Sequence, residues 1–216
     1  MYVDALHQHT PKSKTRMPSL EQLLQASAAR HHHLCPRQVL GVRMGIAGAK
    51  VLGLDVPRSD KRLLVIVETD GCFVSGIEVA TGCSVVHRTV RFEDYGKVAA
   101  VFVDVTTENA FRLAPRPDVR GLAWKYALGE TERYQAQLHA YAVMPEDELI
   151  TIHPVRLRTP IDEIIGRPGV RVICDGCGEE IMNDRQVVTS KGLFCKACVG
   201  ESYYQDEPVD ISVLKI

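Results

Sequence analysis

The sequence predicts an α+β protein, with a mixed helix and antiparallel-sheet core domain and a small C-terminal module built on cysteines. A capping box and an apolar face predict a helix that begins after Ser19, and two further helices are expected at 118–127 and 131–143. Short apolar runs between them are typical of buried strands. Four of the seven cysteines form two C-x-x-C pairs near the C-terminus. Helices together with an antiparallel hairpin predict the α+β class.

Composition restricts the classes of function. The 216 residues carry a formal net charge of −1, which gives no general attraction to nucleic acid or to a membrane. No run of about 20 apolar residues could span a bilayer, and the first residues lack a secretory pattern. We therefore expect a cytoplasmic protein with no membrane partner. In a reducing compartment, seven cysteines indicate metal ligands or reactive thiols, not disulfides.

The first two helices follow from capping signals. Residues 1–17 are expected to form a flexible arm. Ser19, with Gln22 three residues later, has the spacing of a capping box and opens a helix that ends at a run of three histidines. Proline suits the first position of a helix, so Pro36 starts a second helix, to about Leu52, with Cys35 at its N-cap.

The second helix contains Gly41, Gly45 and Gly48. Each glycine costs a helix roughly 1 kcal/mol relative to alanine. Several together indicate that another backbone, or a ligand, approaches this helix closely.

The remaining elements of the core domain, residues 18–165, are assigned from apolar runs and breakers. Residues 94–97 are expected to form a hairpin turn that joins two strands, and residues 159–169 a linker. Pro154 places the last strand at a sheet edge or weakens it. The predicted elements are strands at 63–67, 85–92, 98–105, 111–113 and 149–157, and helices at 73–80, 118–127 and 131–143.

The C-terminal module, residues 170–206, has the pattern of a four-cysteine zinc site. Cys174 and Cys177 form one knuckle, and Cys195 and Cys198 form the other. Two C-x-x-C pairs supply four thiolates for one tetrahedral, closed site, which stabilises folding and leaves no position for catalysis. A hairpin over residues 186–194 and a helix over 197–204 would make this module resemble a treble-clef finger. Nearby acidic residues favour protein contacts over nucleic acid. Residues 207–216 are expected to form a tail.

A second constellation lies in the core domain. His31, His33 and Cys35 alternate, and imidazole and thiolate are both good ligands for transition metals. At a helix N-terminus the Cys35 thiolate is favoured, so this residue is either a metal ligand or a nucleophile. Cys72 and Cys83 are either functional thiols or buried core residues. The histidine run is otherwise a solvated helix end. Lys97 is either an anion or partner contact or part of an ordinary turn.

These segments together resemble the FmdE family, which comprises the FmdE component of formylmethanofuran dehydrogenase and its relatives. The matching stretches are His31–Pro36, Gly41–Gly45, Glu68–Cys72, Thr81–Cys83 and Asp94–Ala99. The resemblance implies an α+β core, a C-terminal treble-clef finger in some members, and dimerisation. It also implies a cleft suited to a metal or a small ligand. Carried over, that cleft maps to His31, His33, Cys35, Cys72 and Cys83.

Three residues depart from the family pattern: Arg37 replaces a glycine, Ser75 an aspartate, and Val86 a glycine. Arg37 adds a positive charge beside the thiol and is a candidate anion or partner contact. Ser75 removes a carboxylate that could act as an acid, a base or a metal-orienting group. Both changes favour metal or anion binding over inherited catalysis.

Three hypotheses remain open. The first is a metal-binding accessory protein or subunit of a molybdenum or tungsten oxidoreductase, with structural zinc in the finger and a second transition metal or a pterin-type ligand in the core. The second is a free-standing enzyme, with Cys35 as nucleophile or ligand and His33 as base or co-ligand. The third, disfavoured by the charge, is a regulator that contacts nucleic acid through the finger.

Overall fold

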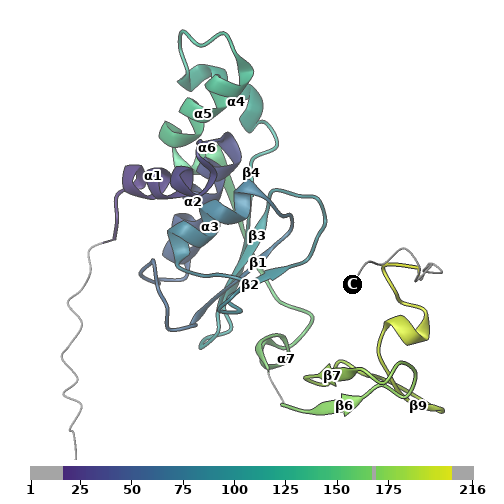
Figure 1. Cartoon of the computed structure of the whole chain (residues 1–216). Helices are drawn as coiled ribbons and strands as arrows, with labels where there is room; N and C mark the ends of the chain where they lie inside the picture. Colours follow the sequence, from purple (N-terminus) through teal and green to yellow (C-terminus); the bar gives the residue numbers. More distant parts are fainter. Residues whose placement is uncertain (1–16, 167–168, 206–216) are drawn as a thin grey trace, which may run out of the picture. The chain divides into compact units, whose positions relative to one another are not determined.

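The structure is a computed structural model that describes residues 17–166 and 169–205. The chain divides into two compact units, and the boundary in the sequence lies between Arg158 and Thr159 (Figure 1). We call them unit 1 and unit 2. The predicted tail and the predicted arm, apart from Met17, lie outside the described residues.

Unit 1 combines helices with a mixed sheet, which confirms the predicted fold class. Among the described residues its helices are α1 (Leu20–His31), α2 (Pro36–Val51), α3 (Cys72–Thr81), α4 (Val119–Tyr126), α5 (Arg133–Val143) and α6 (Glu146–Leu149). Its strands are β1 (Leu63–Val67), β2 (Val90–Phe92), β3 (Ala100–Asp104), β4 (Ala110–Pro115) and β5 (Ile150–Val155). No described helix is long and apolar enough to cross a membrane.

The predicted helix starts are confirmed. The Ser19 hydroxyl accepts the Gln22 backbone N–H at 3.2 Å, and the Gln22 side chain accepts the Ser19 N–H at 2.9 Å. Cys35 is the N-cap of α2, and the Gln38 side chain accepts its backbone N–H at 2.7 Å. These bonds satisfy N–H groups that a helix N-terminus otherwise leaves without partners.

The described strands of unit 1 form one sheet in the order β2-β1-β3-β4-β5. β1 pairs in parallel with β2 and antiparallel with β3, so that Val65 lies between Val90 and Phe102. β5 lies at the edge, as Pro154 predicts, because proline has no N–H for a second neighbour. The sheet is therefore mixed, and every residue of the interior strand β1 is buried.

The predicted hairpin at residues 94–97 is wrong. β2 and β3 lie on opposite sides of β1, because β1, α3 and β2 form a βαβ unit whose crossover returns β2 parallel to β1. The connection from β2 to β3 instead crosses the end of β1, where the Glu68 carbonyl accepts N–H groups from Tyr95 and Lys97, each at 3.0 Å. The first of these two strands is also shorter than predicted, since residues 85–88 form a turn.

Close packing of α2 on α3 explains the glycines of α2. A Cβ atom on Gly41 would lie 2.2 Å from the Phe73 carbonyl oxygen, and one on Gly76 would lie 2.4 Å from the Gln38 carbonyl oxygen. A Cβ on Gly45 would meet Ala80. Later residues of α2 contact later residues of α3, since Gly41 faces Phe73 and Gly45 faces Ala80. The two helices therefore run in the same direction, and their N-termini lie at the same end. The predicted close approach is therefore of another backbone.

A buried ion pair fixes the segment that leads from β1 to α3. The Arg112 guanidinium donates to both carboxylate oxygens of Glu68, at 2.6 and 2.7 Å. The Glu68 side chain is 9% exposed, and a bidentate pair of this kind gives geometric specificity. It holds the chain four residues before Cys72.

Unit 2 contains α7 (Ile161–Ile165), the hairpin of β6 (Arg171–Ile173) with β7 (Glu180–Met182), and the hairpin of β8 (Val187–Thr189) with β9 (Gly192–Phe194). The second hairpin was predicted. α7 lies within residues 159–169, where the sequence indicates only a linker. The helix predicted over residues 197–204 is also wrong: a 3-10 turn covers Ala197–Val199 and ends at Gly200, whose backbone is left-handed with φ 89°.

Asp104, at the end of β3, gives a prediction on acid stability. Hydrogen bonds from Arg62, at 2.9 and 2.7 Å, hold the pKa of this buried carboxyl well below its ordinary value of 3.8. A depressed pKa stabilises the folded state above the ordinary pKa, and this contribution is lost as pH falls through the folded-state pKa. We expect Asp104→Asn to lower the melting temperature at pH 7, with a difference from wild type that shrinks below about pH 4.

Thermal melts across this pH range test the prediction, with Asp55→Asn as the matched control because Asp55 is exposed. A difference between wild type and Asp104→Asn that persists unchanged in acid would show that the Arg62 contact does not stabilise the charged carboxylate.

Candidate metal centre and core thiol pair

The four cysteines of unit 2 come together in space. Their sulfur atoms all lie within 4.8 Å of one another, and the Cys177 and Cys195 sulfurs are 3.9 Å apart. Tetrahedral zinc with Zn–S bonds of about 2.3 Å places its sulfur ligands roughly 3.8 Å apart. The cluster therefore fits a metal ion such as zinc, as the spacing of the two knuckles predicts.

Backbone N–H groups prepare one of these thiols for a metal. N–H groups of Cys177 and Cys195 lower the pKa of Cys174 to about 6. The two knuckles are tied together by Asp175, whose backbone N–H donates to the Leu193 carbonyl at 2.8 Å and whose carboxylate accepts the Leu193 N–H at 2.7 Å. A thiol of low pKa is a ready metal ligand, because metal binding requires the thiolate.

Unit 1 places Cys35 beside Cys72, and we call these two residues the core thiol pair. Cys35 caps α2, and Cys72 is the first residue of α3. The Cys72 thiol lies close enough to Cys35 to raise the pKa of the Cys35 thiol. The pair meets because the glycine contacts bring the two helix N-termini together, a position where helix dipoles favour negative charge. Cys72 also follows β1 closely, and the carboxyl ends of strands in βαβ units are common ligand sites.

Opposing electrostatic effects act on the pKa of Cys35 in the core thiol pair. Burial raises the pKa of the Cys35 thiol, and the neighbouring Cys72 raises it further. Backbone N–H groups of Gln38 and Arg37 act in the opposite direction. The sequence-based expectation of a favoured Cys35 thiolate is therefore wrong, because burial outweighs the effect of the helix N-terminus. A raised pKa keeps Cys35 protonated at neutral pH, so a metal ion that binds there has to displace a proton. A dication can compensate two adjacent thiolates, which otherwise repel each other.

Two residues that sequence analysis did not select support this pair. The Gln38 side chain is fully buried and donates to the Ser27 carbonyl at 2.9 Å while it accepts from Cys35, so it anchors the start of α2 to α1. The Tyr134 hydroxyl donates to the Leu34 carbonyl at 3.3 Å. Its pKa is raised by burial and by the nearby thiols Cys35 and Cys72. The sequence gives a signal for only one of these contacts, the capping-box spacing between Cys35 and Gln38.

The histidines lie on the turn between α1 and α2. His33 is exposed, and its Nδ1 atom is 2.8 Å from the His31 carbonyl oxygen. The two rings are 6.3 Å apart in an edge arrangement. His32 is exposed and has a left-handed backbone at the end of α1. Within the described residues, only the four cysteines of unit 2 form a group of three or more metal-ligand atoms close enough to share one ion.

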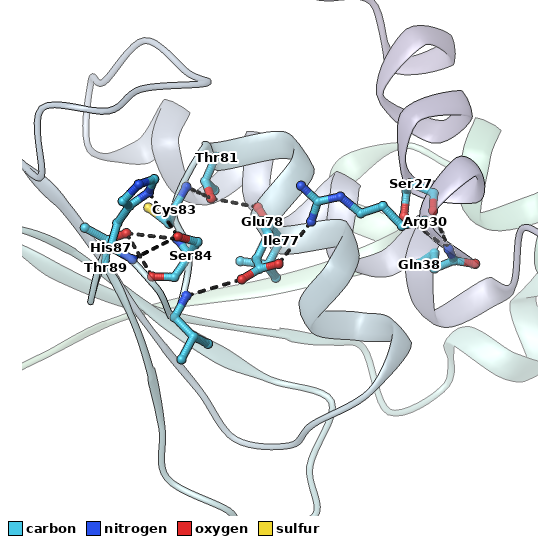
Figure 2. Close-up of polar contacts among 11 residues, drawn as sticks. Ser27, Arg30, Gln38, Ile77, Glu78, Thr81, Cys83, Ser84, His87 and Thr89 are labelled. Carbon is cyan, nitrogen blue, oxygen red and sulfur yellow. Dashed lines mark hydrogen bonds and ion pairs between the residues drawn. The ribbon is translucent and has the colours of Figure 1, made fainter. Parts of the chain in front are cut away.

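Cys83 lies apart from the core thiol pair. It follows the C-terminal end of α3, a helix of ten residues that is roughly 15 Å long, whereas Cys72 begins it. Its thiol donates to the Leu63 carbonyl at 3.3 Å, and the side chain is 3% exposed. Burial raises the pKa of this thiol. In Figure 2, Cys83 and Gln38 lie on opposite sides of Glu78.

The surroundings of Cys83 are a polar network that joins α1, α3 and the following loop (Figure 2). Glu78 accepts from Arg30 at 3.0 Å and from the Val85 N–H at 3.3 Å. The Thr81 hydroxyl accepts the Cys83 N–H at 3.1 Å. His87, next to the departure Val86, has its Nδ1 atom 3.1 Å from the Ser84 hydroxyl. These contacts fix the loop that leads into β2.

The remaining candidate residues from the sequence, Lys97, Ser75 and Arg37, lie at three different positions in unit 1. Lys97 is exposed on the connection between β2 and β3, with its ammonium 5.9 Å from the centre of the Tyr95 ring. Ser75 is 8% exposed, and its hydroxyl has no hydrogen-bond partner among the described residues. Arg37 is exposed at the start of α2 and lines a pocket described below.

Comparison with known proteins identifies the family. A family model described as FmdE, molybdenum formylmethanofuran dehydrogenase operon, matches residues 30–151. The chain belongs to the FmdE family. The matched range contains the core thiol pair, Cys83 and Lys97, and it ends before unit 2. The resemblance inferred from the sequence motifs is confirmed.

Two individual proteins extend this comparison. A protein of Archaeoglobus fulgidus, named a probable S-adenosyl-L-methionine-binding protein, is 34% identical over 220 residues, covering 90% of this chain and 55% of that protein. The chain thus spans about half the length of this curated relative. The crystal structure of a tungsten formylmethanofuran dehydrogenase FmdE-like protein from Syntrophus aciditrophicus has a TM-score of 0.57 at 18% identity, covering 87% of this chain and 96% of that one. This second likeness concerns the fold.

Proposed function

We propose that this FmdE-family protein is a metal-binding accessory protein of a molybdenum or tungsten oxidoreductase, or of the handling of its cofactor. Its core thiol pair takes a transition-metal ion, and its finger holds a structural zinc. The observation that carries the proposal is the position of Cys35 and Cys72 near each other, at the starts of two parallel helices. Thiolates select soft metals, and two converging helix N-termini stabilise their negative charge.

The two metal sites have different purposes. Four protein thiolates close the finger site, so its ion stabilises folding. The core pair supplies two thiolates and leaves further positions for a solvent molecule, a histidine of the 31–33 run or a group from a partner. A site with fewer protein ligands binds more weakly and exchanges more readily. An exchangeable ion suits delivery or sensing of a metal better than a permanent structural role.

The partners follow from the family and the finger. The FmdE description refers to a molybdenum formylmethanofuran dehydrogenase operon, and we infer association with an enzyme of this type. The finger binds either this partner enzyme or the second copy of the chain in a homodimer. The protein acts in the cytoplasm. A net charge of −1 supports protein contacts over nucleic acid.

Cobalt titration tests the core site. The full-length protein, with zinc in its finger, is titrated with Co²⁺ under reducing conditions, and the thiolate-to-cobalt charge-transfer absorption is recorded. We expect this absorption in wild type and its loss in Cys35→Ser and in Cys72→Ser. Cys83→Ser is the matched control, because Cys83 is also buried in unit 1 but lies at the far end of α3.

Absence of the charge-transfer absorption in wild type, or its loss in Cys83→Ser alone, would refute the core site. The accessory role is tested in cells that lack this chain. Molybdenum or tungsten oxidoreductase activity is expected to fall there, and to be restored by wild type but not by Cys35→Ser. Unchanged activity in those cells would refute the accessory role.

A further inference from the structure

A pocket of about 290 Å³ lies in unit 1, beside the first turn of α2. Its walls come from the start of α2, the connection from β4 to α4, and one face of α5. Apolar and proline side chains form part of the lining, including Leu40 and Val119. This volume is near the lower end of the range for small-molecule sites, which are typically apolar with a few convergent polar groups.

The pocket concentrates positive charge. Arg37 from α2, Arg116 from the loop before α4, and Arg120 from α4 all line it, and no acidic side chain belongs to the lining. Among the described residues, neither Arg37 nor Arg120 has a side-chain hydrogen bond or ion pair. The Arg116 guanidinium already donates two hydrogen bonds, to the Asp118 carboxylate at 3.3 Å and to the Asp147 carbonyl oxygen at 3.5 Å. The like charges of Arg37 and Arg120, only partly offset by the Asp118 carboxylate beside Arg116, favour an anion in this cavity.

A buried tyrosine and a glutamine add polar groups to the pocket. Tyr141 is 2% exposed and lines the same pocket. A tyrosine hydroxyl can donate one hydrogen bond, so Tyr141 can contribute a donor to a ligand in this pocket. Gln137, one turn earlier on α5, adds an amide to the lining. The pocket therefore offers a hydroxyl and an amide in addition to the three guanidinium groups.

We propose that this pocket binds a small organic anion through Arg37, Arg116 and Arg120, with Tyr141 as an additional hydrogen-bond donor. The anionic group is a phosphate or a carboxylate, which guanidinium groups bind with matching geometry. The apolar part of the ligand packs against Leu40 and Val119. This inference does not depend on a metal in the core thiol pair. The two sites nevertheless adjoin, because Arg37 lies two residues after Cys35, so the bound anion would lie near the thiols.

Calorimetric titration of the full-length protein with two probes, phenyl phosphate and benzoate, tests the proposal. We expect saturable binding of at least one probe, and the tighter one identifies the anionic group. Benzyl alcohol, which has the ring without the charge, is expected to bind far more weakly. Arg37→Gln/Arg120→Gln should weaken binding by roughly tenfold or more, because charge-assisted hydrogen bonds are the strong ones. Tyr141→Phe removes only the hydroxyl and should weaken binding severalfold.

Arg156→Gln/Arg158→Gln is the matched control. It removes the same charge from two exposed arginines of unit 1 that do not line the pocket, and it should bind like wild type. No binding of either probe to wild type would overturn the proposal. Equal loss in both double variants would also overturn it, because the effect would then come from overall charge. Binding of benzyl alcohol as tight as that of the anions would do the same.

Discussion

Removal of metal from the four-cysteine cluster is expected to unfold unit 2 and to leave unit 1 folded. In the described part of unit 2, the buried hydrophobic residues are only Ile161, Cys174 and Ile181, too few for a core that is stable alone. Structural zinc supplies about 10–16 kcal/mol of apparent binding free energy in fingers of this kind. Cys174→Ser or a strong chelator should therefore abolish the protected amides of residues 170–205.

Amide hydrogen exchange on the full-length protein, read separately for the two units, checks this prediction. Cys83→Ser serves as the control, since it removes a buried thiol of unit 1 and should retain the zinc. If the amides of β6 to β9 stayed protected after complete removal of metal, the finger would fold by packing alone, and the cysteine cluster would have another purpose.

Gly41→Ala is expected to destabilise unit 1 by about 2–3 kcal/mol, because overpacking at a tight contact outweighs the gain in helix propensity. The new Cβ would lie 2.2 Å from the Phe73 carbonyl oxygen, so α2 and α3 have to separate. Separation would also pull Cys35 from Cys72. The same variant should therefore weaken cobalt binding at the core thiol pair.

Gly121→Ala is the matched control, because it lies in α4 with nothing within 4 Å of its added Cβ. It should stabilise the protein by up to about 1 kcal/mol, the difference in helix propensity. Urea unfolding followed by the fluorescence of Trp124, the single tryptophan of the chain, reports on unit 1. Equal or greater stability of Gly41→Ala would show that α2 and α3 are not in contact at this point.

Local signals in the sequence predicted much of the fold. The capping box of Ser19 and Gln22, the proline at the start of α2 and the glycines of α2 each act through neighbouring atoms, and the structure confirms each of them. The two C-x-x-C pairs predicted the four-cysteine cluster for the same reason, since each knuckle is a local turn.

Long-range pairing was not predictable. The residues at 94–97 favour a turn, but a turn looks the same whether its strands are neighbours or lie on both sides of β1. The order of the sheet depends on the crossover through α3, which no local pattern specifies. In unit 2 a helix was expected over residues 197–204, but the 3-10 turn ends at Gly200 after Ala197–Val199.

The site was predicted only in part for the same reason. Cys72 and Cys83 are equally plausible by spacing, and only the direction of α3 brings one of them to Cys35 and carries the other away. Arg116, Arg120 and Tyr141 are distant from Arg37 in sequence and belong to no motif. Their common pocket exists because α4 and α5 fold back beside the start of α2.

The most direct test of the core thiol pair is the number of metal ions per chain, measured by elemental mass spectrometry after equilibration at a fixed concentration of free zinc. We expect wild type and Cys83→Ser to hold more than one ion per chain, and Cys35→Ser/Cys72→Ser to hold one, in the finger. A single ion in all three proteins would contradict a metal site at Cys35 and Cys72.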